Sequence, residues 1–258
     1  MITSTGNAQV KYLQQLQKKG KLRDEEGVFL IEGLRMFEET PAERIRKAYV
    51  SETFYQKQRK IVEEKQVSAE ILSDSVFERV SATKTPQGIL CIVTRREWTK
   101  EEILGAEHPF LMILDNLQDP GNLGTILRTA EGAGVTGILM SKDCVDIYNP
   151  KVIRSTMGSI YRMPFIYLEN LEEFLPELKE YGITSYAAHL EGEHFYDEEN
   201  YTDGCAFLIG NEGNGLRAEV TAKADRRIRI PMHGQVESLN AAMAAGILMY
   251  EVCRQRRK

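Results

Sequence analysis

The sequence predicts an α/β protein whose C-terminal part forms a mostly parallel sheet with helices on both faces. Short apolar runs alternate with helical patterns over the second half of the chain, which is typical of βαβ units. With 258 residues, 42% of them hydrophobic, the chain is long enough to bury one large core or two smaller ones. A smaller α/β unit is expected in front of the parallel sheet.

The N-terminal residues 1–96 predict this smaller α/β domain. Apolar residues at helical spacing and short apolar runs between glycines mark its elements. The expected helices are Asn7–Lys21, Leu34–Glu39 and Glu52–Gln66, and the expected strands are Gly27–Gly33, Ala48–Ser51 and Gly88–Thr94. Residues 97–108 are charged and weakly patterned, and we expect them to form a linker.

Residues 109–258 predict the larger domain. Its expected strands are Phe110–Asp115, Gly137–Met140, Ser185–Ala188, Cys205–Ile209 and Arg227–Ile230. Helices are expected to begin near Asn122 and within Asn149–Ser159, and the last helix to span Asn240–Arg254. Strands and helices that alternate in this way predict a parallel sheet between two helical layers.

Charge is distributed unevenly along the chain. The formal net charge is −5, yet residues 1–100 carry 18 Lys and Arg against 14 Asp and Glu, whereas residues 101–258 carry 15 against 24. Any polyanionic partner is therefore expected on the N-terminal part.

Cysteine and histidine spacing argues against a metal site. The cysteines Cys91, Cys144, Cys205 and Cys253 lie far apart, and the four histidines lack metal-ligand spacing. Few, scattered cysteines fit a reducing cytoplasm. The longest apolar stretch, Ala241–Tyr250, is too short to span a bilayer, and the N-terminus lacks signal-peptide features.

Asn122 and Arg128 belong to the first motif, which runs from Asp119 to Arg128 after a predicted strand. Open α/β sheets bind ligands at the carboxyl ends of their strands, so both residues are candidates for a site. The alternative is that Asn122 only caps a helix and Arg128 is only solvated.

The second motif, Leu208–Leu216, places three glycines directly after an apolar strand. Glycine permits the backbone to approach a ligand closely. The loop lacks the lysine of a P-loop and the spacing of a dinucleotide fingerprint, so a cofactor without phosphates fits better. The alternative is a glycine-rich turn with a solvated Glu212.

The third motif, Ile230–Gly246, joins a strand to an alanine-rich helix that Ser238 or Asn240 is expected to cap. Capping alone would explain both residues. The small residues after Asn240 permit close packing of this helix on the sheet or on a second subunit.

Taken together and in this order, the three motifs resemble the SpoU/TrmH family of the SPOUT class of RNA methyltransferases. Asn122 with Arg128 resembles the family's first motif, Gly210–Leu216 its second, and Ile230–Met232 with Ser238–Asn240 its third. The segments Val28–Leu34 and Thr83–Gly88 resemble the L30e-like substrate-binding domain of many members.

The resemblance implies a deep trefoil knot in the C-terminal domain, a homodimer, and S-adenosylmethionine as the methyl donor without a metal. S-adenosylhomocysteine is then the second product. The cofactor-binding residues that the resemblance implies are Gly210, Asn211, Gly213, Ile230, Met232 and Leu239. Its implied catalytic residues are Asn122, Arg128, Glu212, Ser238 and Asn240, which act on a ribose 2′-hydroxyl.

Arginine stays protonated in proteins, so we expect Arg128 to bind a phosphate and the developing alkoxide rather than to act as a base. Glu212 is expected to pair with Arg128 or to orient it. Structured RNA is the expected substrate, and ribosomal RNA is favoured over transfer RNA. The alternatives are a non-catalytic RNA-binding protein on the same fold and methylation of a base nitrogen; an oxidoreductase lacks its fingerprint here.

Overall fold

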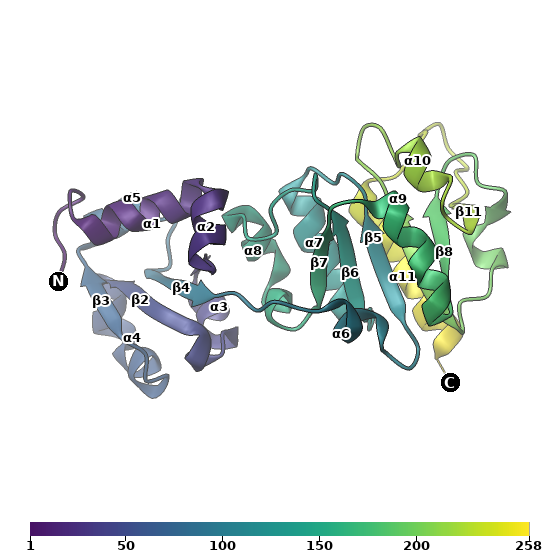
Figure 1. The fold of residues 1–258 in the computed structure, drawn as a ribbon. Helices are drawn as coiled ribbons and strands as arrows, with labels where there is room; N and C mark the ends of the chain where they lie inside the picture. Colours follow the sequence, from purple (N-terminus) through teal and green to yellow (C-terminus); the bar gives the residue numbers. More distant parts are fainter. Residues whose placement is uncertain (258) are drawn as a thin grey trace. The chain divides into compact units, whose positions relative to one another are not determined.

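The computed structural model describes residues 1–257 as two compact units, and each is α/β as predicted (Figure 1). Unit 1 comprises Met1–Arg96 together with Asp146–Tyr161. Unit 2 comprises Glu97–Val145 and the chain from Arg162 onward. The predicted boundaries at 96 and 109 remain predictions. The segment Asp146–Tyr161 belongs to unit 1, although the residues before and after it in the sequence belong to unit 2.

Unit 1 is built on a four-stranded sheet in the order β1-β4-β2-β3. Strand β4 is antiparallel to both of its neighbours, whereas β2 and β3 are parallel. Its strands are β1 (Val28–Glu32), β2 (Ile45–Ser51), β3 (Ala69–Leu72) and β4 (Ile89–Thr94). Its helices are α1 (Ala8–Lys18), α2 (Gly20–Glu26), α3 (Leu34–Glu39), α4 (Glu52–Glu64), α5 (Asp74–Val80) and α8 (Pro150–Thr156).

Unit 1 differs from the sequence expectation in several details, among them helix α5, which was not predicted. The helix expected over Asn7–Lys21 is divided, because Lys19 adopts an extended backbone (φ −112°, ψ 103°) between α1 and α2. Strand β3 was not predicted, since only its last residue, Leu72, is fully buried and its apolar pattern is therefore weak.

Helix α8 packs within unit 1, although its sequence lies inside the region assigned to the larger domain. The ring of Tyr148 lies 4.9 Å from that of Phe29, and Asp146 forms an ion pair with the buried Arg23. Tyr161 Oη also hydrogen-bonds Thr40 Oγ1 at 2.5 Å. These contacts depend on side chains more than 100 positions apart, which explains why periodicity did not reveal them.

Unit 2 contains a seven-stranded sheet in the order β7-β6-β5-β10-β8-β11-β9, and its paired strands are parallel. This confirms the predicted mostly parallel sheet. Its strands are β5 (Phe110–Leu114), β6 (Gly137–Ser141), β7 (Phe165–Leu168), β8 (Ile183–Ala188), β9 (His194–Phe195), β10 (Gly204–Ile209) and β11 (Arg226–Arg229). Its helices are α6 (Lys100–Leu104), α7 (Pro120–Gly132), α9 (Leu171–Phe174), α10 (Ala218–Thr221) and α11 (Ala241–Arg256).

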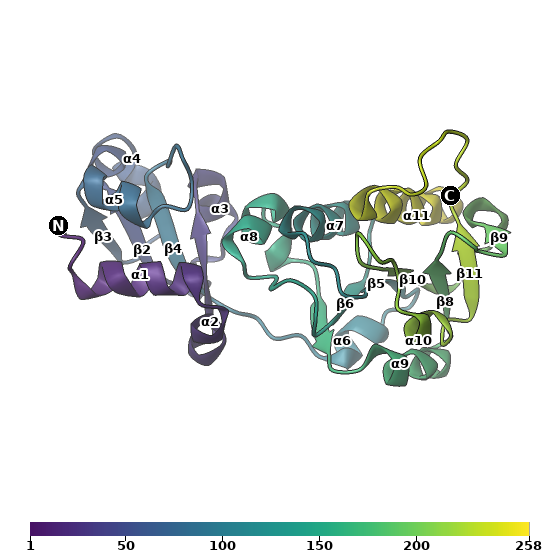
Figure 2. The same cartoon turned by 90° about the horizontal axis from the view of Figure 1, so that it is seen from above.

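Helices cover both faces of this sheet. Helices α7 and α11 lie on one face, and α6 and α9 lie on the other (Figure 2). On the second face, Leu111 and Ile113 of β5 pack with Ile103 of α6 and Phe174 of α9 in one core. Residues 97–108, expected to form a linker, therefore include a helix that belongs to the core of unit 2.

The topology gathers the three motifs at one edge of the sheet. Since β5, β10 and β11 run in parallel, the loops that follow them leave the sheet at the same end. The predicted trefoil knot stays a prediction. Within residues 1–257, no helix has both the length and the apolar character that crossing a membrane requires.

Candidate active site

A pocket of about 290 Å³ lies at the carboxyl edge of the sheet in unit 2. The glycine loop, Gly210–Leu216, forms one wall, and residues 228–232 and 238–244 contribute the others. All six predicted cofactor-binding residues line it: Gly210, Asn211, Gly213, Ile230, Met232 and Leu239. Glu212 and Ser238 line it as well, together with Ala188, His189 and Leu190, which the motifs did not indicate.

The glycine loop is a tight hairpin. Asn211 and Gly215 exchange two backbone hydrogen bonds, each 2.9 Å long. A Cβ atom on Gly210 would lie 2.1 Å from the carbonyl carbon of Gly215, so only glycine fits at position 210. The loop therefore presents its backbone to the pocket in a fixed conformation.

Glu212, at the tip of the glycine loop, connects it to the loop after β5. Its carboxylate accepts hydrogen bonds from the backbone amides of Gln118 (3.1 Å) and Asp119 (2.9 Å) and from Nδ2 of Asn122 (3.0 Å). Partial burial raises the pKa of Glu212, but these hydrogen bonds lower it more strongly, and the net pKa lies below the ordinary value. Glu212 is therefore exposed at the surface and still held by three hydrogen bonds.

Asn122 links Glu212 to the third motif. It is only 8% exposed, and its Oδ1 accepts a hydrogen bond from Nδ2 of Asn240 at 2.9 Å. The alternative that Asn122 only caps the helix is wrong, because Asp119 caps α7 by accepting from the amide of Asn122. Asn240, not Ser238, caps α11.

Arg128 lies exposed on α7, and its guanidinium makes no hydrogen bond or ion pair with any residue from 1 to 257. The expected pairing of Arg128 with Glu212 is thus absent. Instead, the structure brings together Asn122, Glu212 and Asn240 and leaves Arg128 as an uncompensated cation. A cation without a partner is available to an anionic ligand.

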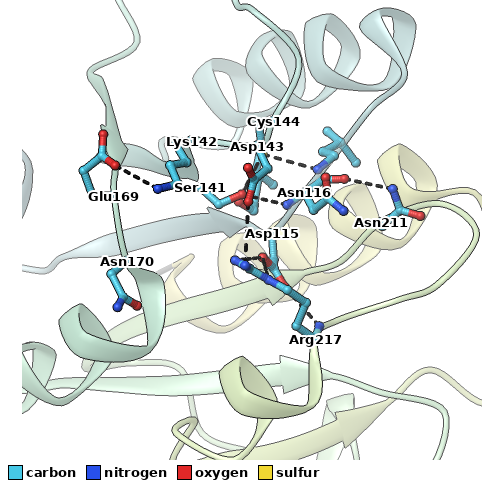
Figure 3. Close-up of polar contacts among 12 residues, drawn as sticks. Asp115, Asn116, Ser141, Lys142, Asp143, Cys144, Glu169, Asn170, Asn211 and Arg217 are labelled. Carbon is cyan, nitrogen blue, oxygen red and sulfur yellow. Dashed lines mark hydrogen bonds and ion pairs between the residues drawn. The ribbon is translucent and has the colours of Figure 1, made fainter.

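Sequence reasoning missed a second set of contacts, behind the glycine loop (Figure 3). Asp115 is fully buried and forms an ion pair with Arg217, while Nδ2 of Asn211 donates to the carbonyl oxygen of Asn116 at 2.9 Å. A carboxylate directly after an entirely buried strand is a signal for a nearby cation, because a buried charge needs a partner.

The donor set of the pocket fits a cofactor without phosphate groups. The only arginine or lysine among its lining residues, Arg229, stacks on the ring of Phe195 with its Cζ 4.4 Å from the ring centroid. The other lining groups are backbone amides and carbonyls, apolar side chains, the side chains of Asn211 and Asn214, His189, Ser238 and one carboxylate. Such groups suit a purine, a ribose and an amino-acid moiety.

Comparison with known families decides the assignment. The family described as SpoU rRNA Methylase matches residues 109–250, which is more than half of the chain. The chain belongs to the SpoU rRNA methylase family. A second family, described as the MRM3-like substrate binding domain, matches residues 7–91.

Relatives of this SpoU family member extend over nearly its full length. It is 34% identical to the 23S rRNA (guanosine(2553)-2′-O)-methyltransferase RlmP of Bacillus subtilis, over 97% of this chain and 98% of the relative. The crystal structure of the AdoMet-bound rRNA methyltransferase from Sinorhizobium meliloti is similar with a TM-score of 0.87 and 30% identity, covering 100% of this chain and 98% of that one.

The SpoU methyltransferase AviRb from Streptomyces viridochromogenes, in complex with AdoMet, is also similar, with a TM-score of 0.87 and 25% identity over 97% of this chain and 98% of that chain. Family membership confirms the predicted fold class, activity and cofactor. The SpoU member described here is an S-adenosylmethionine-dependent RNA 2′-O-methyltransferase.

Proposed function

We propose that this enzyme methylates a ribose 2′-hydroxyl of ribosomal RNA, and that Arg128, Asn122, Glu212, Ser238 and Asn240 form its catalytic centre. The observation that carries the proposal is a series of hydrogen bonds from Glu212 through Asn122 to Asn240. These bonds join all three motifs, and Glu212 lines the pocket.

Ribosomal RNA is proposed as the substrate because the full-length relative from Bacillus subtilis carries 23S rRNA in its name. Unit 1 is proposed to bind that RNA. The matched substrate-binding family covers residues 7–91. Residues 1–100 also carry a net positive charge, which favours RNA binding. A cytoplasmic location is proposed together with this substrate.

The pocket of unit 2 is proposed to hold the cofactor. Backbone groups of Gly210, Gly213, Ile230 and Leu239 would bind it, and the side chains of Asn211 and Met232 would complete the contact. When bound, S-adenosylmethionine supplies a methyl group already activated by a positive sulfur. The chain that follows β11 and the glycine loop is proposed to form the predicted trefoil knot around this pocket.

Arg128 is proposed to bind the phosphate next to the target ribose and to stabilise negative charge that develops on the 2′-oxygen. Its guanidinium is exposed and has no ion-pair partner among residues 1–257, so binding RNA breaks no internal contact there. A guanidinium stays protonated, which excludes proton abstraction but suits electrostatic stabilisation.

Asn122 and Glu212 are proposed to orient the loops that carry the reacting groups. Glu212 fixes two backbone amides of the loop after β5, and Asn122 bonds both Glu212 and Asn240. Positioning of this kind reduces the entropic cost of bringing a weak nucleophile to an activated methyl. Ser238, on the pocket wall, is proposed to contact the substrate.

A homodimer is proposed through α11. Met243, Ile247 and Tyr250 follow one another at helical spacing, and Met243 and Tyr250 are 61% and 55% exposed. An apolar stripe on a helix whose other face is already packed against α7 and the sheet fits a second copy of the same surface.

The experiment that tests the proposal uses S-adenosylmethionine labelled on its methyl group. The enzyme is incubated separately with ribosomal RNA and with transfer RNA that lack modifications, and each RNA is digested to nucleosides. A labelled 2′-O-methylnucleoside is expected. Label on a base, or label only in transfer RNA, would contradict the proposal.

A further inference from the structure

The contacts behind the glycine loop point to a function for Asp115 and Arg217. We propose that they form a positioning pair that fixes the glycine loop in the shape the methyl donor requires. The inference rests on the proposed function of the pocket. Neither residue lines the pocket, so their effect on the reaction is exerted through the loop.

Three donors of Arg217 bond the carboxylate of Asp115. Nε and Nη2 of Arg217 donate to Oδ1 of Asp115 at 2.8 and 2.6 Å, and the backbone amide of Arg217 donates to Oδ2 at 3.0 Å. Both carboxylate oxygens are therefore occupied by one residue. The planar guanidinium suits this geometry, which an ammonium group reproduces only in part.

Asp115 and Arg217 lie at positions in the sequence where they can hold both ends of the glycine loop. Asp115 directly follows β5, and Arg217 directly follows the glycine loop. The loop begins where the amide of Asp115 donates to the carbonyl oxygen of Ile209 at 2.9 Å. Both ends of the loop are thus attached to the same residue at the end of β5.

A second tether lies between these ends. Nδ2 of Asn211 donates to the carbonyl oxygen of Asn116, and Asn116 adopts a positive φ of 53° that turns this carbonyl toward the loop (Figure 3). Oδ1 of Asn211 accepts from the amides of Gly213 (2.9 Å) and Asn214 (3.1 Å). The loop after β5 therefore acts as a template for the glycine loop.

Removal of the Arg217 side chain leaves the buried carboxylate of Asp115 without its cationic partner. Asp115 is 0% exposed, and without its partner it would keep a buried, uncompensated charge. Only the backbone amide at position 217 would then hold the end of the glycine loop to this carboxylate. Cofactor affinity is expected to fall, because backbone groups of that loop line the pocket.

The test compares Arg217→Ala with Arg226→Ala. Both substitutions break an ion pair to a buried carboxylate in unit 2, but the second pair, Arg226 with Glu199, does not include the glycine loop. The dissociation constants for S-adenosylhomocysteine and for ribosomal RNA are measured by calorimetry and filter binding, well below the melting temperature of each variant.

Arg217→Ala is expected to weaken S-adenosylhomocysteine binding about 10-fold or more, consistent with the loss of a charged hydrogen-bonded pair. RNA binding should stay within about 2-fold, and Arg226→Ala should bind the cofactor product like the wild type. Arg217→Lys should restore part of the affinity, because its ammonium compensates the charge but makes one contact instead of two.

Equal cofactor affinity in Arg217→Ala and Arg226→Ala would overturn the inference. If Arg217→Ala does not fold, Arg217→Lys is used as the test. Wild-type affinity of Arg217→Lys for S-adenosylhomocysteine would contradict a positioning role that needs two guanidinium donors. Failure of the proposed function is recognised separately, since the wild-type enzyme would then bind neither S-adenosylmethionine nor its product.

Discussion

The side-chain amide of Asn240 donates a hydrogen bond to Oδ1 of Asn122 at 2.9 Å, across 118 positions of sequence. Oδ1 of Asn240 caps α11 at the same time by accepting from the amides of Ala242 and Met243. Asn240 therefore combines a structural role with a contact to the catalytic motif, and the two roles use different atoms.

Asn240→Asp separates the two roles. Aspartate keeps the capping oxygen and caps helices as well as asparagine does, but it has no amide to donate to Asn122. We expect a melting temperature close to that of the wild type and a methylation rate lowered about 10-fold or more. Asn240→Ala should also lose about 1 kcal/mol of stability with the cap. A wild-type rate in Asn240→Asp would show that the Asn122 contact is dispensable.

Arg128→Ala is expected to lower the rate of methyl transfer about 100-fold or more, because it removes the charge proposed to stabilise the transition state. Affinity for S-adenosylhomocysteine should stay unchanged, since Arg128 does not line the pocket. Thr125→Ala, an exposed position one turn earlier on α7, is the control and should remain active. Rates are measured in single turnover with saturating RNA. Full activity in Arg128→Ala would contradict the assignment.

Glu212→Gln tests the hydrogen-bonded carboxylate through pH. Because the folded-state pKa lies below the ordinary value of 4.5, the carboxylate stabilises the fold above about pH 4.5, and this contribution is lost as pH falls through the lower pKa. Urea unfolding should show the wild type about 1 kcal/mol more stable than the variant near pH 7. That difference should shrink below pH 4.5. A difference that grows in acid would exclude this assignment.

Gly210→Ala should abolish cofactor binding, because the added methyl would lie 2.1 Å from the backbone of Gly215 and would force the loop apart. Gly234→Ala is the matched control in the loop of the third motif, since a methyl group added there would have no neighbouring atom within 4 Å. Binding of S-adenosylhomocysteine is measured by calorimetry. If both variants bind equally well, the tight hairpin is not required for the pocket.

Ile247→Glu should convert a dimer into a monomer, because it places a charge in the apolar stripe of α11. Tyr181→Glu changes an exposed tyrosine, 42% exposed and outside α11, and should leave the oligomeric state unchanged. Light scattering after size-exclusion chromatography measures the molar mass. A monomeric wild type, or a dimeric Ile247→Glu variant, would contradict the proposed interface.

Local patterns in the sequence were enough to predict the fold class and most of the pocket. Buried runs such as Phe110–Leu114 are long enough and apolar enough to form the central strands, and Gly210 permits a backbone approach that no other residue allows. The six residues predicted to bind the cofactor all line the pocket, because each lies in a loop that follows a strand ending at the same edge of a parallel sheet.

The partners of the polar side chains could not be predicted and are seen in the three-dimensional structure. The distances in sequence from Asn122 to Glu212 and to Asn240 are 90 and 118 residues, and no local pattern records such contacts. For the same reason the expected pairing of Glu212 with Arg128 was wrong, and the ion pair of Arg217 with Asp115 was not predicted. A charged or amide side chain forms hydrogen bonds with polar groups within about 3 Å. Which groups lie that close depends on the order of the strands, and this order is a property of the whole sheet.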